Sequence, residues 1–548
     1  MKGSQRCSCR FFWAAEMLKR YSTNWPEDFS AAAAGLLMTA ACPDIDMGWI
    51  AWFALVPLLH SLRRAAAGDA FRRGMVAGMA HYLTLIYWIV HTMRVYGGLP
   101  WHLAVPPLFL LTAYLSLYVG LFALLWSRLQ HSAAAMLLAA PVFWTGLEYL
   151  RSFLLSGFPW ALVGYSQHRY LHLIQISDIF GVYGVSFVVV LCNAGLFMAV
   201  PALAGGRRQG FRVRRRHAAA GLLTVFAAVA GIWIYGVFRI QDTDRRAAAA
   251  PAIRAAVVQG NIDQMVKWDP AHQEGTIDKY LALSRGIDPP ADLVVWPETA
   301  VPFYLMSDRA LTRKVLDGIR ETGAHFVIGS PSFERTETGI DFFNSAYLMT
   351  PDGRPAGRYD KVHLVPFGEY VPLQQWLPFV RKLVAHVGDF KTGEKGETLP
   401  MAGRRIRGRS EGGTSLRIGV LICYEIIFPD LSRAAAANGA GLLVNVTNDA
   451  WYGRSSAPYQ HFSMAVFRAV ENKRALVRSA NTGISGFIDP VGRVGGATPL
   501  FVDAAAAQSV PVLTEKTVYT RTGDWFAASC LGMTIIITLW LFFRRRES

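Results

Sequence analysis

Long apolar stretches alternate with short polar connections over the first 240 residues, and one more apolar stretch lies near the C-terminus. Most of them reach the roughly 20 residues that a helix needs to cross the hydrocarbon core of a bilayer. The pattern predicts eight membrane helices. The first two are the shortest and also fit a re-entrant pair or buried core helices. The eight stretches are 29–42, 47–62, 75–93, 103–126, 133–150, 181–203, 218–238 and 525–543.

The long segment 239–524 has a different pattern. Short runs rich in Val, Ile and Leu alternate there with helical patterns such as 308–322 and 458–476. Near-continuous apolar runs of this length are typical of buried strands in an α/β sheet. We therefore expect four parts. They are an N-terminal tail (1–28), a membrane domain of about seven helices (29–238), an α/β domain (239–524), and a last membrane helix with a short tail (525–548).

Composition agrees with a membrane protein. Hydrophobic residues make up 52% of the 548 residues and charged residues only 17%, whereas soluble domains carry about a quarter. So many apolar side chains exclude a disordered chain, and six cysteines are too few for a disulfide scaffold. The net charge of +16 comes mainly from basic clusters between the apolar stretches. A nucleic-acid-binding domain carries such clusters on its folded surface, so we exclude nucleic acid as a partner.

The basic residues also predict an orientation. If the N-terminus is cytoplasmic, the connections on that side hold 19 of the 22 Lys and Arg that lie outside 239–524. Because Lys and Arg are retained on the cytoplasmic side, the α/β domain is predicted to lie on the opposite side of the membrane.

Cys423 is the only cysteine of segment 239–524, and it ends the predicted strand 417–423. A lone cysteine is more often a small buried hydrophobic residue than a nucleophile. Its position favours the nucleophile, because α/β proteins build their sites at the carboxyl ends of strands. The polar pair Tyr424 and Glu425 follows it directly.

Two further residues complete a possible reaction centre. Glu298 ends the run LVVW and follows Pro297, and Lys361 lies in RYDKVHLVPFGEYVP. Taken alone, each is more simply a solvated surface charge. Together with Cys423 they supply a base, a cation and a thiol, the set that covalent acyl transfer requires. No zinc-like ligand spacing and no Gly-rich phosphate loop is found, so we expect neither a metal nor a cofactor.

The motifs around these residues resemble a known superfamily. WPE, YDKVHLVPFGEYVP and GVLICYE, with NVTNDAWYG (445–453) and ENKRALVRSANTGISGFIDPVGR (471–493), are similar to the nitrilase superfamily. With the membrane helices, QGNIDQMVKWDP (259–270) and EYLRSFLLSGFPWALVGYSQ (148–167), the chain resembles the apolipoprotein N-acyltransferase family.

This resemblance implies an αββα sandwich joined to a polytopic helical membrane domain. It implies Cys423 as nucleophile, Glu298 as general base and acid, and Lys361 as the group that stabilises the oxyanion. The supporting residues that it implies are Glu369, Trp268, Tyr424 and Glu425.

The resemblance also implies a reaction and a location. An acyl chain would pass from a phospholipid, through a cysteine thioester, to the N-terminal amine of a diacylglyceryl-cysteine in an apolipoprotein. The enzyme would lie in the bacterial inner membrane with its catalytic domain facing the periplasm.

Two alternatives remain open on the residues alone. One is a membrane-tethered amidase or nitrilase that hydrolyses a lipid-linked amide or ester, and the other is a transporter or binding protein that has lost catalysis.

Some further features are candidates for substrate contacts. Glu148, Arg151 and Tyr165 are candidate docking residues, although Glu148 and Arg151 also suit a structural ion pair at i,i+3. The apolar segment 371–379 is a candidate membrane-facing lid, although it also suits an inward-packed loop. Segment 397–414, rich in Gly and Arg, is predicted to be a mobile loop.

Overall fold

The structure is a computed structural model that describes residues 25–130, 132–203, 214–337, 339–370, 390–402 and 416–544. The predicted lid 371–379 lies outside the described residues. So do residues 1–24 of the N-terminal tail and most of the predicted loop 397–414.

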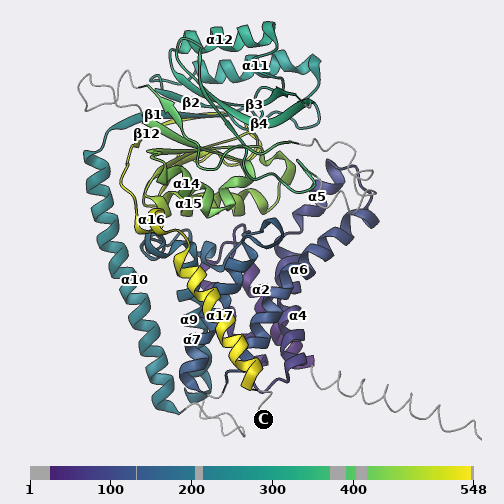
Figure 1. Ribbon diagram of the computed structural model, residues 1–548, viewed down its shortest axis with the longest axis vertical. Helices are drawn as coiled ribbons and strands as arrows, with labels where there is room; N and C mark the ends of the chain where they lie inside the picture. The colour runs from purple at the N-terminus through teal and green to yellow at the C-terminus, as the bar shows by residue number, and fades with distance from the viewer. Residues whose placement is uncertain are drawn as a thin grey trace, which may run out of the picture.

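The apolar stretches form a bundle of helices beneath an α/β domain (Figure 1). Five of the described helices are long and apolar enough to cross a membrane, namely α6, α7, α9, α10 and α17. The helices of this bundle are α2 (Trp25–Ala40), α3 (Val56–Ser61), α4 (Ala67–Leu85), α5 (Trp88–Val95), α6 (Trp101–Ser127), α7 (Ala133–Arg151), α8 (Leu171–Ile174), α9 (Ser177–Leu203), α10 (Arg215–Ala249) and α17 (Trp525–Arg544). Short 3₁₀ turns join them: η1 (Gly48–Trp52), η2 (Leu154–Ser156) and η3 (Val163–Gln167).

The N-terminal part of the bundle departs from the predicted eight helices. The stretch 47–62 divides into η1 and α3, and the stretch 75–93 divides into α4 and α5. Helix α4 also begins earlier than predicted and takes in Arg72 and Arg73. Both side chains have polar partners there, because Arg72 pairs with Asp28 and Arg73 donates to the carbonyl of Ser61.

Helix α10 is longer than its apolar stretch. The prediction ends it at 238, but it continues to Ala249, for 35 residues in all. Charged pairs support the extra turns: Arg239 lies 2.5 Å from Asp178 and 2.9 Å from Asp242. Strand β1 begins at Ala252, so α10 leads from the bundle into the α/β domain with almost no intervening loop.

The α/β domain contains two six-stranded sheets. The first runs in the order β12 (Ala504–Pro511), β1 (Ala252–Gln259), β2 (Leu293–Val295), β3 (His325–Thr336), β4 (Gly339–Met349) and β5 (Pro355–Asp360). The second runs in the order β11 (Val494–Gly495), β10 (Gly486–Ile488), β9 (Ala475–Ala480), β8 (Leu442–Thr447), β7 (Leu416–Ile422) and β6 (Leu399–Met401).

Helices cover the outer faces of both sheets. Helices α11 (Pro270–Arg285) and α12 (Arg309–Thr322) lie over the first sheet, whereas α14 (Pro429–Ala437) and α15 (Ala457–Asn472) lie over the second and face the membrane bundle (Figure 1). Helix α16 (Val518–Thr522) leads from the domain to α17. The predicted fold class, a polytopic helical domain joined to an αββα sandwich, is confirmed.

Apolar cores among the described residues hold these layers together, and three of them involve the α/β domain. Aliphatic side chains such as Val257, Val295 and Val444 fill the space between the sheets, and a second core joins the first sheet to α11 and α12. The third core is shared: residues of α14 and α15, such as Leu431 and Met464, belong to the same cluster as the membrane helices. The sandwich is therefore held on the bundle by buried apolar contacts as well as by the chain connections.

Candidate active site

Three strand ends bring the predicted reaction centre together. Glu298 follows β2, Lys361 follows β5, and Cys423 follows β7 of the other sheet. All three are buried, with exposed fractions of 7%, 1% and 6%. The Lys361 ammonium nitrogen lies 3.6 Å from Oε1 of Glu298, and the charges of both residues act on the Cys423 thiol.

Local backbone features fix these positions. A Cβ on Gly329 of β3 would lie 2.4 Å from the carbonyl oxygen of Pro297 and 2.7 Å from Cα of Glu298. Only glycine therefore allows β3 to approach the Glu298 turn so closely. Cys423 has a φ of +53°, a left-handed conformation that costs a non-glycine residue of order 1–3 kcal/mol and that the surrounding structure must hold in place.

Asn344 and Glu369 complete a polar network around Glu298 and Lys361. The Asn344 amide donates to Oε1 of Glu298 and to Oε1 of Glu369, at 2.8 Å each. The Lys361 ammonium donates to the same oxygen of Glu369 at 2.9 Å, and the Val365 N–H donates to its other oxygen at 2.8 Å. One oxygen, Oε2 of Glu298, is buried without a hydrogen-bond partner among the residues that the structure describes. Such an oxygen is well suited to take up a proton.

The charges of this network act on the thiol and the ammonium in opposite ways. Burial raises the pKa of the Cys423 thiol, the Glu298 carboxylate raises it further, and Lys361 offsets part of the effect. The thiol is thus protonated at neutral pH and needs a base before it can attack. Burial alone lowers the pKa of Lys361, but Glu369 and Glu298 outweigh that effect and raise it, so this side chain stays charged.

Glu425 joins the loop that carries Lys361 to the turn that carries Cys423. Its carboxylate accepts hydrogen bonds from the hydroxyl of Tyr359 at 3.0 and 3.1 Å and from the backbone N–H groups of Val362 at 2.6 Å, His363 at 3.1 Å and Ile422 at 2.7 Å. Burial raises its pKa to about 7 against the opposing effect of these backbone donors. Both carboxylate oxygens of Glu425 accept hydrogen bonds, so this side chain has a structural role and holds the two segments together.

Two family matches cover most of the chain. Residues 34–195 match the apolipoprotein N-acyltransferase N-terminal domain, and residues 254–504 match the carbon-nitrogen hydrolase family. The chain is 43% identical to an apolipoprotein N-acyltransferase of Geobacter metallireducens, over 94% of this chain and 95% of that one. The chain belongs to the apolipoprotein N-acyltransferase family. A relative of the same name from Azotobacter vinelandii is 33% identical over 95% and 96% of the two chains.

These full-length matches favour the predicted acyltransferase over a membrane-tethered amidase and over a transporter. Among solved structures, an amidase of Nesterenkonia AN1 from the nitrilase superfamily matches 51% of this chain and 98% of its own, at 22% identity and a TM-score of 0.36.

The other supporting residues of the acyltransferase prediction lie in different environments. Tyr424 is buried, with its ring edge-on to Phe428 at 5.3 Å between centroids. Trp268, in contrast, is 52% exposed. Glu369, Tyr424 and Glu425 therefore lie in the walls of the site, and Trp268 lies on the surface of the domain.

Two residues of the site were absent from the sequence-based prediction. Asn344 stands out only as a polar residue inside the apolar strand FFNSAYLM, a signal that could have drawn attention to it. Lys267, next to Trp268, is buried and donates from its ammonium to the backbone carbonyl of Glu298 at 3.1 Å. Burial lowers the pKa of Lys267 to about 8, while Glu298 and Cys423 act in the opposite direction.

The candidate docking residues of the membrane domain also make hydrogen bonds within the protein. Oε1 of Glu148 accepts from the Trp144 indole at 2.9 Å and from the Val163 N–H at 2.8 Å. Arg151 donates to the hydroxyl of Tyr82, and no ion pair between Glu148 and Arg151 occurs in the described part of the chain. The third candidate, Tyr165, accepts at its hydroxyl from Arg468 of α15 at 3.0 Å. Tyr165 thus joins the bundle to the α/β domain.

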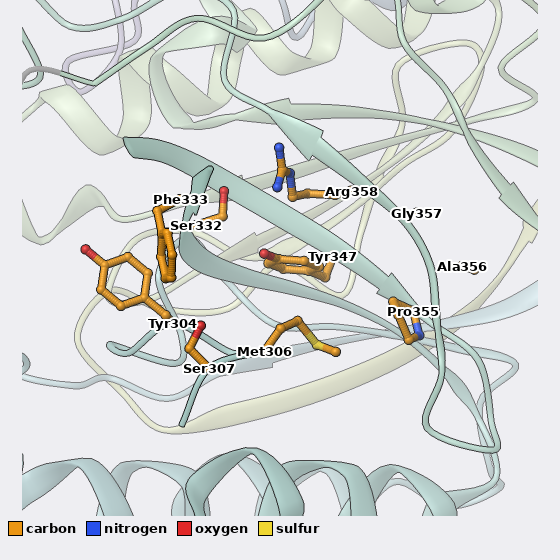
Figure 2. A pocket seen from close by; sticks show the side chains of 10 residues that line it. All are labelled: Tyr304, Met306, Ser307, Ser332, Phe333, Tyr347, Pro355, Ala356, Gly357 and Arg358. Carbon is orange, nitrogen blue, oxygen red and sulfur yellow. The ribbon is translucent and has the colours of Figure 1, made fainter. Parts of the chain in front are cut away.

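A surface cavity of about 420 Å³ lies elsewhere on the domain (Figure 2). Its lining includes Tyr304, Phe333 and Tyr347. Because side chains alternate along a strand, Tyr347 and Asn344 of β4 point to opposite faces of the first sheet. The cavity is therefore separate from the Cys423 site. Among the described residues, no group of three or more His, Cys, Asp or Glu side chains is arranged to hold a metal ion.

Proposed function

We propose that this protein transfers an acyl chain from a phospholipid to the N-terminal amine of a diacylglyceryl-cysteine in an apolipoprotein, through a thioester on Cys423. The observation that carries the proposal is the unpartnered, buried Oε2 of Glu298 in the cluster that contains the protonated Cys423 thiol and the Lys361 cation. The names of the relatives supply the acceptor class.

The first half-reaction uses all three residues. Glu298 takes the thiol proton as the Cys423 sulfur attacks the ester carbonyl of the phospholipid. The oxyanion of the tetrahedral intermediate is stabilised by the Lys361 ammonium and by the backbone N–H of Tyr424. The C–O bond then breaks, and Glu298 returns its proton to the departing glycerol oxygen. A lysophospholipid leaves, and the acyl chain remains on the sulfur.

The second half-reaction reuses Glu298. It removes a proton from the α-amine of the diacylglyceryl-cysteine as the nitrogen attacks the thioester. The C–S bond then breaks as Glu298 returns this proton to the sulfur, which regenerates the thiol. Ester, thioester and amide follow one another without an external energy source, because the final amide is the most stable of the three. Neither step calls for a metal or a cofactor.

A mass measurement tests the thioester. Purified protein incubated with phospholipid should gain the mass of one acyl chain and release one lysophospholipid. Cys423→Ala should gain none, and Cys423→Ser should at most form a slow oxyester that stalls before transfer. An acyl adduct at full level in Cys423→Ala would overturn the nucleophile and the proposed mechanism with it.

The acceptor is tested by adding a peptide that begins with diacylglyceryl-cysteine. The acyl chain should move from protein to peptide as an amide. Free fatty acid as the main product would instead identify a hydrolase.

We also propose that the protein lies in the bacterial inner membrane with its α/β domain facing the periplasm, on the strength of the basic residues between the helices. A thiol reagent that cannot cross the membrane should label Lys395→Cys in intact cells and leave Arg215→Cys unlabelled, with the unsubstituted chain as the background control. The reverse labelling would contradict this orientation.

A further inference from the structure

A second polar cluster lies behind Cys423, and the reaction steps above do not use it. Asp449, His461 and Arg478 are fully buried there. Arg478 lies 2.8 Å from Oδ2 of Asp449, and Nδ1 of His461 lies 3.0 Å from Oδ1. Thr447 donates its hydroxyl hydrogen to the same Oδ1 at 2.9 Å. The cluster therefore holds the His461 ring on its Nδ1 side.

The other side of this ring contacts the nucleophile residue. Nε2 of His461 lies 3.2 Å from the backbone carbonyl oxygen of Cys423. A carbonyl oxygen can only accept, so the ring donates through Nε2 in this contact, and because burial lowers the pKa of His461 the neutral ring carries no second hydrogen. Its Nδ1 therefore accepts from the Arg478 guanidinium, which lies 3.0 Å away. The carbonyl belongs to the residue whose φ of +53° needs support from its surroundings. The contact fixes the peptide plane after Cys423, and with it the direction of the Cα–Cβ bond that carries the thiol.

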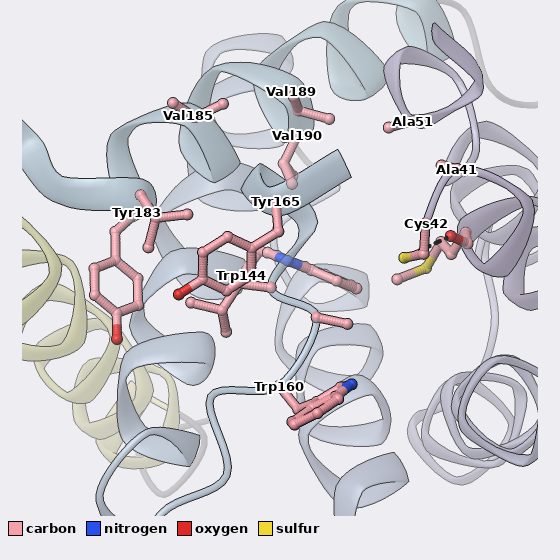
Figure 3. Close-up of a cluster of buried hydrophobic side chains, with 14 of the residues drawn as sticks. Ala41, Cys42, Ala51, Trp144, Trp160, Tyr165, Tyr183, Val185, Val189 and Val190 are labelled. Carbon is pink, nitrogen blue, oxygen red and sulfur yellow. Dashed lines mark hydrogen bonds between the residues drawn. The ribbon is translucent and has the colours of Figure 1, made fainter. Parts of the chain in front are cut away.

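The flat face of the His461 ring is covered from the membrane domain. Trp160, on the loop between η2 and η3, stacks on it with centroids 5.6 Å apart and planes 21° apart. Its indole N–H donates to the side chain of Gln460 at 2.7 Å. Figure 3 shows Trp160 in the buried cluster of the membrane domain. The ring centroids of Trp160 and of Trp88 on α5 lie 5.0 Å apart. Trp160 of the membrane bundle is thus linked to the backbone of Cys423 through one intervening side chain, that of His461.

We propose that His461 is a positioning residue for Cys423, and that Trp160 of the membrane domain holds the His461 ring in place. The membrane domain then completes the catalytic turn in addition to anchoring it. This inference rests on the proposed thioester chemistry and extends it to residues that touch neither substrate.

The first test compares two substitutions of His461. His461→Leu removes the donor, whereas His461→Gln can present an amide N–H near the position of Nε2. We measure the rate constant of thioester formation at saturating phospholipid, per folded molecule, together with the phospholipid KM. His461→Leu should lose at least tenfold in rate constant with KM little changed, and His461→Gln should recover most of the loss. A purely structural role would lower the yield of folded protein and leave the rate per folded molecule unchanged.

The second test uses the membrane side of the contact. Trp160→Leu should lower the same rate constant, and Trp160→Phe, which keeps an aromatic face on His461, should restore much of it. Trp126→Leu is the matched control, because Trp126 is another fully buried tryptophan of the bundle whose indole donates to the carbonyl of Met136 at 3.2 Å. It should cost stability without changing the rate per folded molecule.

The outcomes separate the two proposals. Absence of an acyl adduct on the unsubstituted protein counts against the proposed function itself. A normal adduct rate in both His461→Leu and Trp160→Leu, or an equal loss in Trp126→Leu, overturns the positioning role alone. If His461→Leu does not fold, Trp160→Leu decides by the same rate measurement, since it leaves the polar contacts of His461 in place.

Discussion

Two buried glutamates near Cys423 have opposite surroundings. Glu425 accepts from one hydroxyl and three backbone N–H groups. Glu298 accepts from Asn344 and faces Lys361 on one oxygen, while the other oxygen has no partner in the described structure. A carboxylate that is saturated with donors fixes the chain around it, and the donors offset part of the effect of burial, which raises the pKa of Glu425 to about 7. One with a free oxygen retains its capacity to accept a proton. Burial is common to both, so the donors decide which glutamate holds the fold and which can act as a base.

The largest effect should come from Glu298→Gln, which keeps the size of the side chain and removes its basicity. Thioester formation should fall by about 10²–10⁴-fold, the range for loss of a general base, with the fold retained. Single-turnover mass analysis with phospholipid checks this. Turnover within tenfold of normal would show that the free oxygen has no catalytic use.

Lys361→Arg should follow. The planar guanidinium cannot replace a compact ammonium between Glu298 and Glu369, even though the charge is kept. We expect a loss of about 10²–10³-fold in rate constant, as for the removal of an oxyanion donor. The phospholipid KM is measured in parallel. Near-normal turnover would reduce Lys361 to a structural counter-ion of Glu369.

Glu425→Gln tests the saturated member of the pair. Its amide nitrogen cannot accept from the backbone donors, so at least one buried N–H loses its partner, at a cost of about 1–3 kcal/mol in the free energy of unfolding. The rate of thioester formation should fall far less than in Glu298→Gln. Thermal unfolding and single-turnover kinetics on the same preparation separate the two effects. A larger kinetic loss here than at Glu298 would reverse the comparison.

Tyr359→Phe should have the smallest effect, because it removes one of the four groups that donate to Glu425 and keeps the ring. The expected loss is about 0.5–1.5 kcal/mol in the free energy of unfolding, with a rate constant close to normal. Denaturant titration measures the first quantity. A loss of activity without a loss of stability would mean that the hydroxyl acts on the reaction instead of on Glu425.

Sequence alone placed Glu298 and Cys423 at the ends of predicted strands and identified Lys361 from the motif around it. In the structure the three residues follow β2, β7 and β5 respectively, so their convergence agrees with the fold class. Asn344 lies inside β4, and its approach to Glu298 depends on the register of β4 between β3 and β5. His461 lies on α15, where nearly every residue is buried and several of the buried residues are polar, so one buried polar residue gives no periodic signal.

The ends of the membrane helices also differ from the sequence-based prediction. Hydropathy located the apolar stretch of α10 but ended the helix at 238, because the turns that follow are charged and are held by pairs such as Arg239 with Asp178. It also treated 75–93 as one span, although the structure breaks it between α4 and α5. Apolar character reports burial in lipid or protein, and a helix can continue beyond it wherever its polar side chains find partners.

The unbroken length of α10 determines how high the α/β domain lies above the membrane and how it is rotated. At 1.5 Å per residue its 35 residues span about 52 Å, roughly 20 Å more than the hydrocarbon core of a bilayer. The upper part is fixed sideways by Arg493, whose guanidinium lies 2.7 Å from Asp244. Each residue inserted or deleted there changes the height of β1 by about 1.5 Å and turns it by about 100° around the helix axis. The height of the α/β domain above the lipid and its rotation relative to the bundle therefore change together. Even a one-residue change in the length of this segment would break the contacts between the sandwich and the bundle.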